Sequence, residues 1–426
     1  MKRVLLLLTL GFSLTAIAKD SATVVADDVV APSADFIELT EAYQNRPKIA
    51  PENNAFIYLV GLTAPEDTDP MAFGQKIIDR SNQKIANGGE SDTPEPKAAY
   101  SIPCTLAKHQ ELAREIIHNK AILLKRRQTL LTLPDYQNTM TIDLLASVPY
   151  YGSNIRLQQL ALIDLWLNRN NYAPEKIKQA LQKDYSFRLR QSANASTLLE
   201  KMVALAGLRH NYYWLNEILK SVDSGRAAAL TPRYLETPIP ASALSMRMAY
   251  IGELQFYISL FKPQNADDEF NLASQLSDNE KQRLFNYKAT LLKRLIHISE
   301  SNDFQQQLKQ LEADNNIQKY LELMTALDKD SGGKLREFAF GDTPFEQFVL
   351  LIAKYIERPY ELTAIQKAVK VLQAIRQQAI EPVNIPAFLQ QSEQHNPLTQ
   401  KSFAWDSDKQ RIMIKTAEGQ VYYLAL

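Results

Sequence analysis

The sequence predicts a mainly α-helical fold, an irregular helical bundle or superhelix with a small antiparallel β meander at its C-terminal end. Only 13 of the 426 residues are glycine, well below the average of about 7%, which disfavours glycine-rich turns and barrels. Apolar residues recur at helical spacing through most of the chain. Short strand-like runs separated by turn residues appear only in residues 401–426.

The first 18 residues, MKRVLLLLTLGFSLTAIA, have the three-part pattern of a secretory signal peptide. Lys2 and Arg3 form a basic head, residues 4–14 form an apolar core, and Ala16 and Ala18 provide the small side chains of a cleavage site. The core is too short for a permanent bilayer span, which needs about 20 residues. We therefore expect cleavage after Ala18, a periplasmic location and no transmembrane segment in the mature chain.

Charge and cysteine content limit the possible partners. The chain has 48 Lys and Arg against 48 Asp and Glu, a formal charge of 0. Such a balance gives no basis for nucleic-acid binding, and Lys125–Arg127, the densest basic cluster, is interpreted as a solvated helix face. Cys104 is the single cysteine, so no internal disulfide can form. Whether Cys104 is buried or reactive stays open.

The N-terminal half is expected to begin with a flexible mature N-terminus, residues 19–35, followed by a helical body over 36–400. Within the body, Ala55–Val60 predicts a short helix and residues 82–100 a loop, since glycine and proline gather there. Residues 104–133 predict one long helix that ends at Pro134.

The middle of the chain predicts packed helix pairs. Residues 153–169 are apolar on most sides, which is typical of a buried helix, and Pro174 begins a partner helix. Thr197–Glu200 has the capping-box form and begins the next helix. Residues 211–222 are expected to return antiparallel to it.

Three prolines in 226–245 predict an extended crossing and a possible sub-boundary of the body. Helices are then expected near 245–260, 278–299, 303–328, 344–357 and 363–380, the last with a capping box at Thr363. The predicted meander has strands near 402–405, 411–416 and 420–425.

No catalytic, metal-binding or cofactor-binding pattern is recognisable. The five histidines form no HExxH and no i, i+4 pair, and His109 is expected to be buried. There is no glycine-rich phosphate loop or dinucleotide fingerprint. Ser81–Lys84 has the Ser-x-x-Lys spacing of penicillin-binding serine enzymes, but it is expected to end a helix where that chemistry needs one to begin.

The candidate binding residues fall in two places. The stronger group, placed at the predicted junction of two helices, is Arg209, Tyr212, Tyr213 and Trp214. Arginine and amphipathic aromatic rings are typical of interfaces, although helix junctions also use them for packing. Asp164 is an acid on an apolar helix, either functional or paired with a neighbour such as Arg156. Lys201 is the remaining candidate.

Short segments spread over most of the chain carry a resemblance. They are residues 56–62, 64–67, 69–70, 124–127, 133–134, 198–204, 261–263 and 396–403. These segments are similar to an uncharacterised family of exported proteins of Gram-negative proteobacteria, although Gln264–Asp267 departs from the Asn-Ala-Thr stretch expected there. The resemblance implies export and a helical fold, and it implies no activity.

Three functions are compatible with these observations. The first is a binding or scaffold protein of the cell envelope, which would have an envelope protein or component as partner. The second is an envelope hydrolase with an unrecognised site around Asp164, Lys201 and Arg209. The third is a carrier of a small apolar ligand, which needs an apolar cavity between helices.

Overall fold

The computed structural model describes residues 29–87, 109–143, 151–262, 276–301, 355–415 and 421–426, together with the single positions 146, 149, 309, 322 and 325. The described part is mainly α-helical and ends in a small antiparallel sheet, which confirms the predicted fold class. The predicted signal peptide, Cys104, and nearly all of residues 303–328 and 344–357 lie outside the described residues.

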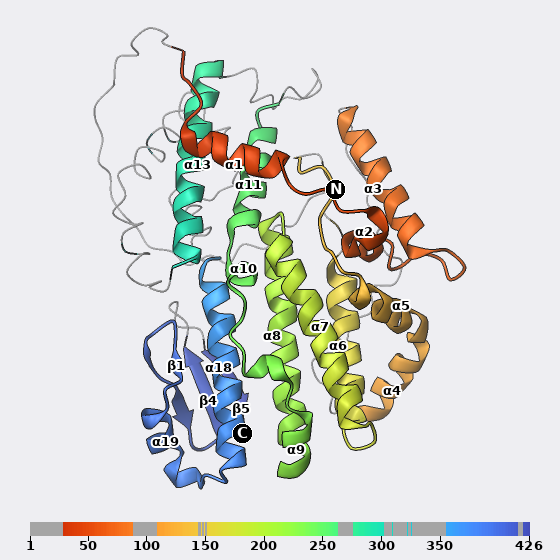
Figure 1. Cartoon of the computed structure of the whole chain (residues 1–426), viewed down its shortest axis with the longest axis vertical. Coiled ribbons are helices and arrows are strands. Elements are labelled where there is room, and N and C mark those ends of the chain that lie inside the picture. Colours follow the sequence, from red (N-terminus) through yellow and green to blue (C-terminus); the bar gives the residue numbers. More distant parts are fainter. Residues whose placement is uncertain are drawn as a thin grey trace.

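The centre of the molecule is formed by three long helices that run side by side (Figure 1): α6 (Tyr151–Leu167), α7 (Pro174–Asn194) and α8 (Leu198–Lys220). α6 and α7 confirm the two helices predicted from residue 153 and from Pro174. α8 is one continuous helix, so the predicted antiparallel return over 211–222 is wrong. Buried residues at Leu205, Leu208, Tyr212 and Leu215 continue one stripe through the expected junction.

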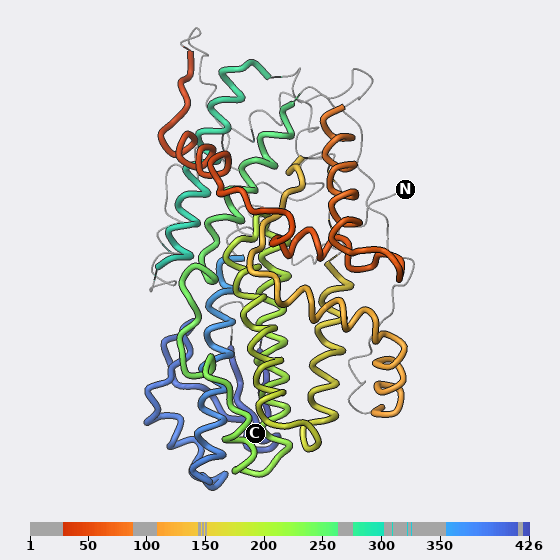
Figure 2. Tube along the Cα trace, turned by 45° about the vertical axis from the view of Figure 1, so that its right-hand side comes forward, coloured from red at the N-terminus to blue at the C-terminus, as the bar shows by residue number. Residues whose placement is uncertain are grey.

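A second helical layer lies at one end of α8 and contains α1 (Ala34–Gln44), α11 (Arg247–Ser259) and α13 (Asp278–Ser299). Figure 1 shows α1 crossing over the other two, and the turned view of Figure 2 shows it against α13. The approach of α11 to α8 is close, because an added Cβ at Gly252 would lie 1.6 Å from the carbonyl oxygen of Ser196. Glycine is therefore required where α11 crosses the start of α8.

On the other side of the molecule from the layer of α1, α11 and α13 lie four further helices (Figure 1). They are α2 (Ala55–Val60), α3 (Pro70–Ala86), α4 (Gln110–Asn119) and α5 (Ala121–Thr132). α2 confirms the short predicted helix. The long helix predicted over 104–133 is divided at Lys120 into α4, which packs on α6, and α5, which also contacts α2 and α7. The predicted loop begins too early, because α3 continues to Ala86.

Residues 226–245 form short helices rather than an extended crossing: α9 (Ser224–Leu230), a 3₁₀ turn (Arg233–Leu235) and α10 (Ala241–Leu244). Asp223 caps α9 by accepting a hydrogen bond from the Arg226 amide, and an alanine-rich run favours a helix after it. Pro232 directly precedes the 3₁₀ turn, and Pro240 directly precedes α10.

The C-terminal part consists of α18 (Glu357–Gln377), α19 (Ile385–Gln391) and five short strands. The strands are β1 (His395–Asn396), β2 (Lys401–Ser402), β3 (Ala404–Asp406), β4 (Arg411–Lys415) and β5 (Val421–Ala425). β3, β4 and β5 form the predicted antiparallel meander, while β1 and β2 form a separate hairpin. α18 begins before Thr363, whose hydroxyl donates to the carbonyl of Pro359, so the predicted capping box there is wrong.

None of the described helices is long and apolar enough to cross a membrane.

Candidate ligand pocket

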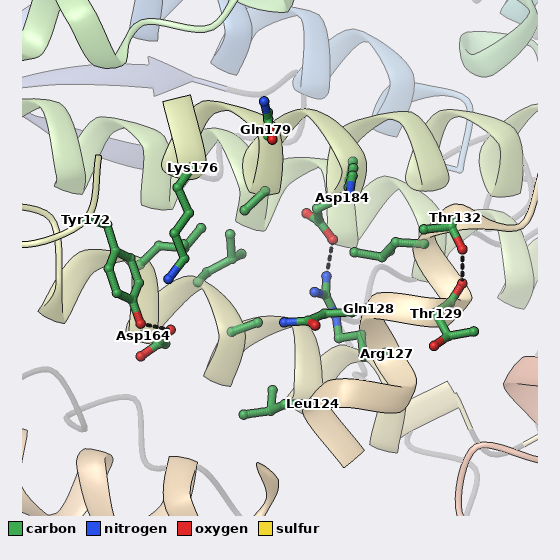
Figure 3. Close-up of a pocket in the computed structure, with 16 residues that line it drawn as sticks. Leu124, Arg127, Gln128, Thr129, Thr132, Asp164, Tyr172, Lys176, Gln179 and Asp184 are labelled. Atoms are coloured by element: carbon green, nitrogen blue, oxygen red, sulfur yellow. Dashed lines mark hydrogen bonds and ion pairs between the residues drawn. The ribbon is translucent and has the colours of Figure 1, made fainter. Parts of the chain in front are cut away.

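A pocket of about 560 Å³ lies between α5, α6 and α7 (Figure 3). Its apolar lining is formed by Leu124, Leu131, Ala161, Leu162, Leu165 and Ala180. Ala161 on α6 and Ala180 on α7 contribute only methyl groups, so the facing helices leave space between them. The volume lies within the roughly 300–1,000 Å³ that is usual for small-molecule sites.

The floor of the pocket contains a buried ion pair between Arg127 of α5 and Asp184 of α7 (Figure 3). Both side chains are almost completely buried. Burial lowers the pKa of the Arg127 guanidinium, and the neighbouring Asp184 charge opposes that change. The Nε atom of Arg127 is buried without a hydrogen-bond partner in the described part of the chain.

Asp184 is held in place from behind the pocket by α6 and α8. Its Oδ2 atom accepts hydrogen bonds from the side-chain amides of Gln158 and Asn211, each at 2.8 Å. Asn211 in turn accepts a 2.5 Å hydrogen bond from the Tyr234 hydroxyl. The network fixes the carboxylate, and through it the Arg127 guanidinium, so this side of the pocket is rigid.

Asp164, Tyr172 and Lys176 form a second polar group, on the opposite side of the pocket from the ion pair (Figure 3). The Asp164 carboxylate accepts hydrogen bonds from the Asn168 amide at 2.9 Å and the Tyr172 hydroxyl at 3.3 Å. Burial raises the pKa of Asp164 despite these bonds. The Lys176 ammonium lies 3.3 Å from the centre of the Tyr172 ring, a cation–π arrangement. The expected pairing of Asp164 with Arg156 is replaced by these contacts.

A second hollow of about 470 Å³ adjoins the first and is lined mainly by α4 and α5. The two share Leu124, Gln128 and Asp164. Arg114 and Lys125 line only the second hollow. Lys125 is exposed as predicted, but the other two members of the basic cluster are buried.

Arg126 is buried for a structural reason. Its guanidinium donates to main-chain carbonyls of the turn after α2, including those of Ala64 at 2.5 Å and Pro65 at 2.7 Å. These oxygens have no helical partner, so the arginine satisfies them. The interpretation of Lys125–Arg127 as a uniformly solvated face is therefore wrong at two of its three positions.

Lys201, the candidate on α8, is 1% exposed and does not line the pocket. Its ammonium donates to the carbonyl oxygens of Ser192 at 2.8 Å and Ala243 at 2.7 Å. Burial lowers its pKa to about 7. These contacts tie α8 to the end of α7 and to α10.

The predicted cluster at residues 209–214 lies in the interior of α8, and its side chains point in different directions. Arg209 contacts Tyr422 of β5, and Tyr212 is buried against Tyr185 and Tyr234. The two remaining rings are nearer the surface: Tyr213 is 44% exposed, and Trp214 packs edge-on against Trp166. A helix turns about 100° per residue, so Tyr212 and Trp214 point to nearly opposite sides of α8.

The structure does not bring the three residues of the hydrolase hypothesis together. Asp164 lines the pocket, while Lys201 and Arg209 stand about 12 Å apart along α8 at a 1.5 Å rise per residue. Each has its own partners, as described above.

Of the charged residues that line the pocket, only Asp164 was among the predicted binding residues. Arg127, Asp184 and Lys176 each look like ordinary helix-surface charges in the sequence, since the ion pair joins residues 57 positions apart. The only available indication was that Asp184 falls between Leu181 and Tyr185 on the predicted helix, where its face is apolar.

The described residues contain no group of three or more His, Cys, Asp or Glu side chains that could hold a metal ion. His109 is exposed at the start of α4 rather than buried, because the helix begins directly after it.

Comparisons of the chain with protein-family models, with curated proteins and with solved structures gave no significant match. The similarity to exported proteobacterial proteins therefore stays a prediction, and function is argued from the pocket.

Proposed function

We propose that this chain is an exported protein of the cell envelope and that it binds a small ligand in the pocket between α5, α6 and α7. The observation that carries the proposal is the pocket itself, which combines an apolar lining with fixed polar groups on two sides. That combination is usual for ligand sites, where apolar contacts supply affinity and a few polar groups set orientation.

The chemistry of the lining favours binding over hydrolysis. Asp184 is already held by Arg127 and two amides, and Asp164 by a phenol and an amide. The Thr132 hydroxyl donates to the carbonyl of Thr129 at 2.7 Å and faces no general base within hydrogen-bonding distance among the described residues. An activated nucleophile needs such a base.

The proposed location rests on the first 18 residues, whose basic head, apolar core and small residues before Lys19 have the order of an export signal. A binding protein of the envelope also agrees with the balanced charge of the chain.

The pocket can be tested with N-phenyl-1-naphthylamine, a neutral apolar fluorophore that becomes bright when it leaves water. We expect a saturable fluorescence increase with one site per chain. Ala180→Trp should abolish it, because the indole ring would fill the space that the alanine leaves between α5 and α7.

Ala72→Trp is the matched control, since Ala72 is exposed on α3 and does not line the pocket. Its saturation curve should equal that of the original protein. Absence of saturable binding to the original protein, or equal binding to both tryptophan variants, would contradict the proposed function.

A further inference from the structure

The residues that line the two adjoining hollows carry an excess of positive charge. Five lysines and arginines, Arg114, Lys125, Arg127, Lys176 and Lys183, face two aspartates, Asp164 and Asp184. The chain as a whole is neutral, so this excess is local. Concave surfaces with one sign of charge concentrate ligands of the opposite sign.

Two of these lysines form no ion pair within the described part of the chain. Lys183 lines the pocket from α7 and, within the described part of the chain, forms no ion pair. Lys176 has a tyrosine ring as its close contact and no carboxylate within ion-pair distance among the described residues. Lys178 on the same helix does have such a partner, Glu175, at 2.6 Å.

The floor offers a further donor. Arg127 binds Asp184 through one terminal nitrogen, and its Nε is buried with no partner among the described residues. A buried donor that makes no hydrogen bond is costly, so a ligand or water that reaches this atom would be favoured.

Resting on the proposed function, we infer that the ligand is an anionic amphiphile with a single hydrocarbon chain. Its hydrocarbon part lies against the leucine and alanine side chains of α5, α6 and α7, and its acidic head group faces Lys176 and Lys183. Both parts of such a ligand find partners in the pocket, because apolar side chains and ammonium groups without an ion-pair partner among the described residues line one space of about 560 Å³.

Displacement of bound N-phenyl-1-naphthylamine by compounds that share a dodecyl chain tests the head-group preference. The compounds are dodecanoate, dodecyl phosphate, dodecanol and dodecyltrimethylammonium, each below its micelle-forming concentration at pH 8. We expect both anions to displace the dye at concentrations about 10-fold lower than dodecanol, the size of effect that two exposed ion pairs can supply. The difference should shrink in 0.5 M NaCl, since salt screens exposed charges.

The double variant Lys176→Gln/Lys183→Gln should lose the preference for the anions while dodecanol still displaces the dye. Lys178→Gln, which removes a lysine from the same helix outside the pocket lining, should keep it. Displacement by dodecanol or by the cation at concentrations as low as those of the anions would overturn the inference and leave the proposed function standing. Failure of the dye to bind at all would instead contradict the proposed function.

Discussion

Lys201 differs from Arg127, Arg188 and Lys288, the other cations of the described chain that are at most 5% exposed, in having no carboxylate beside it. Arg127 and Arg188 lie in the field of Asp184, and Lys288 lies in that of Glu253. Lys201 has only two carbonyl oxygens as partners, and burial alone lowers its pKa to about 7. The charged form of Lys201 therefore destabilises the folded protein.

Because the pKa of Lys201 differs between the folded and unfolded chain, the free energy of unfolding depends on pH. Between pH 7 and 10.5 the unfolded chain keeps the Lys201 proton, with a pKa of 10.5, while the folded chain releases it at about pH 7. Stability rises with pH where the unfolded state binds more protons. The original protein should therefore gain stability from this residue as the pH increases from 7 to 10.

Lys201→Met removes that dependence. In urea unfolding at several pH values, the stability of the variant should rise less steeply than that of the original protein, by up to about 1.4 kcal/mol per pH unit. Parallel stability curves for the two proteins over pH 7–10 would show that Lys201 does not titrate as described.

The ion pair in the pocket floor gives a second residue-scale prediction. Asp184→Asn leaves the Arg127 guanidinium buried without its counter-charge, so we expect a loss of about 3–5 kcal/mol in the free energy of unfolding. The same change at Asp164, which is only partly buried and has two neutral partners, should cost about 1 kcal/mol or less. Equal losses for the two variants in urea titrations would contradict the assigned roles.

Single residues were the least predictable part of the molecule. Asp164 could be identified because it interrupts an apolar helix, and the structure places it in the pocket. Arg126 and Arg127 could not, because a charged residue is buried only if tertiary structure supplies its partners. Those partners lie 57–64 residues away in the chain.

Helices and strands were more predictable, since apolar spacing is local information. α2, α6, α7 and the three-stranded meander follow the predicted positions closely. The errors occurred where a prediction relied on a motif of only a few residues, such as a capping box. Thr197 caps α8, yet the Glu200 carboxylate accepts from the amide of Ser196 rather than from that of Thr197, so the predicted capping box is only half formed.

Close helix contacts provide a prediction at the scale of elements. Gly252→Ala would bring a Cβ to 1.6 Å from the Ser196 carbonyl oxygen, so α11 must move away from the start of α8. We expect a loss of at least about 1–3 kcal/mol, as for other overpacked sites.

Gly225→Ala is the matched control, because its added Cβ would approach nothing nearer than 3.4 Å. Gly225 lies in α9, where alanine is the better helix former by about 1 kcal/mol. Thermal unfolding should therefore show a lower midpoint for the first variant and an equal or higher midpoint for the second. A lowered midpoint for both would contradict the close α8–α11 contact as the cause.

At the scale of the whole molecule, α8 joins the parts of the fold. It packs against α7 and α6 beside the pocket, against α18 near the sheet, and against α11 at its N-terminal end (Figure 1). The sequence predicted helices in these regions, but it contained no information on which helix lies at the centre. That depends on contacts between distant segments.

The proposed export is the second feature at the scale of the whole molecule. Expression of the full chain in a Gram-negative host should give a periplasmic protein whose N-terminal sequence begins at Lys19, because the small residues at 16 and 18 define the cleavage site. N-terminal sequencing of the periplasmic fraction measures this. A cytoplasmic protein that retains residues 1–18 would contradict the proposed location.

The central claim is that the space between α5, α6 and α7 is a ligand site. Photolabelling with a diazirine-bearing dodecanol, followed by peptide mapping, tests it independently of head-group charge. The account predicts adducts concentrated in residues 121–132, 161–165 and 172–184, and their loss in Ala180→Trp but not in Ala72→Trp. Adducts concentrated elsewhere, or unchanged labelling of these segments in Ala180→Trp, would contradict it.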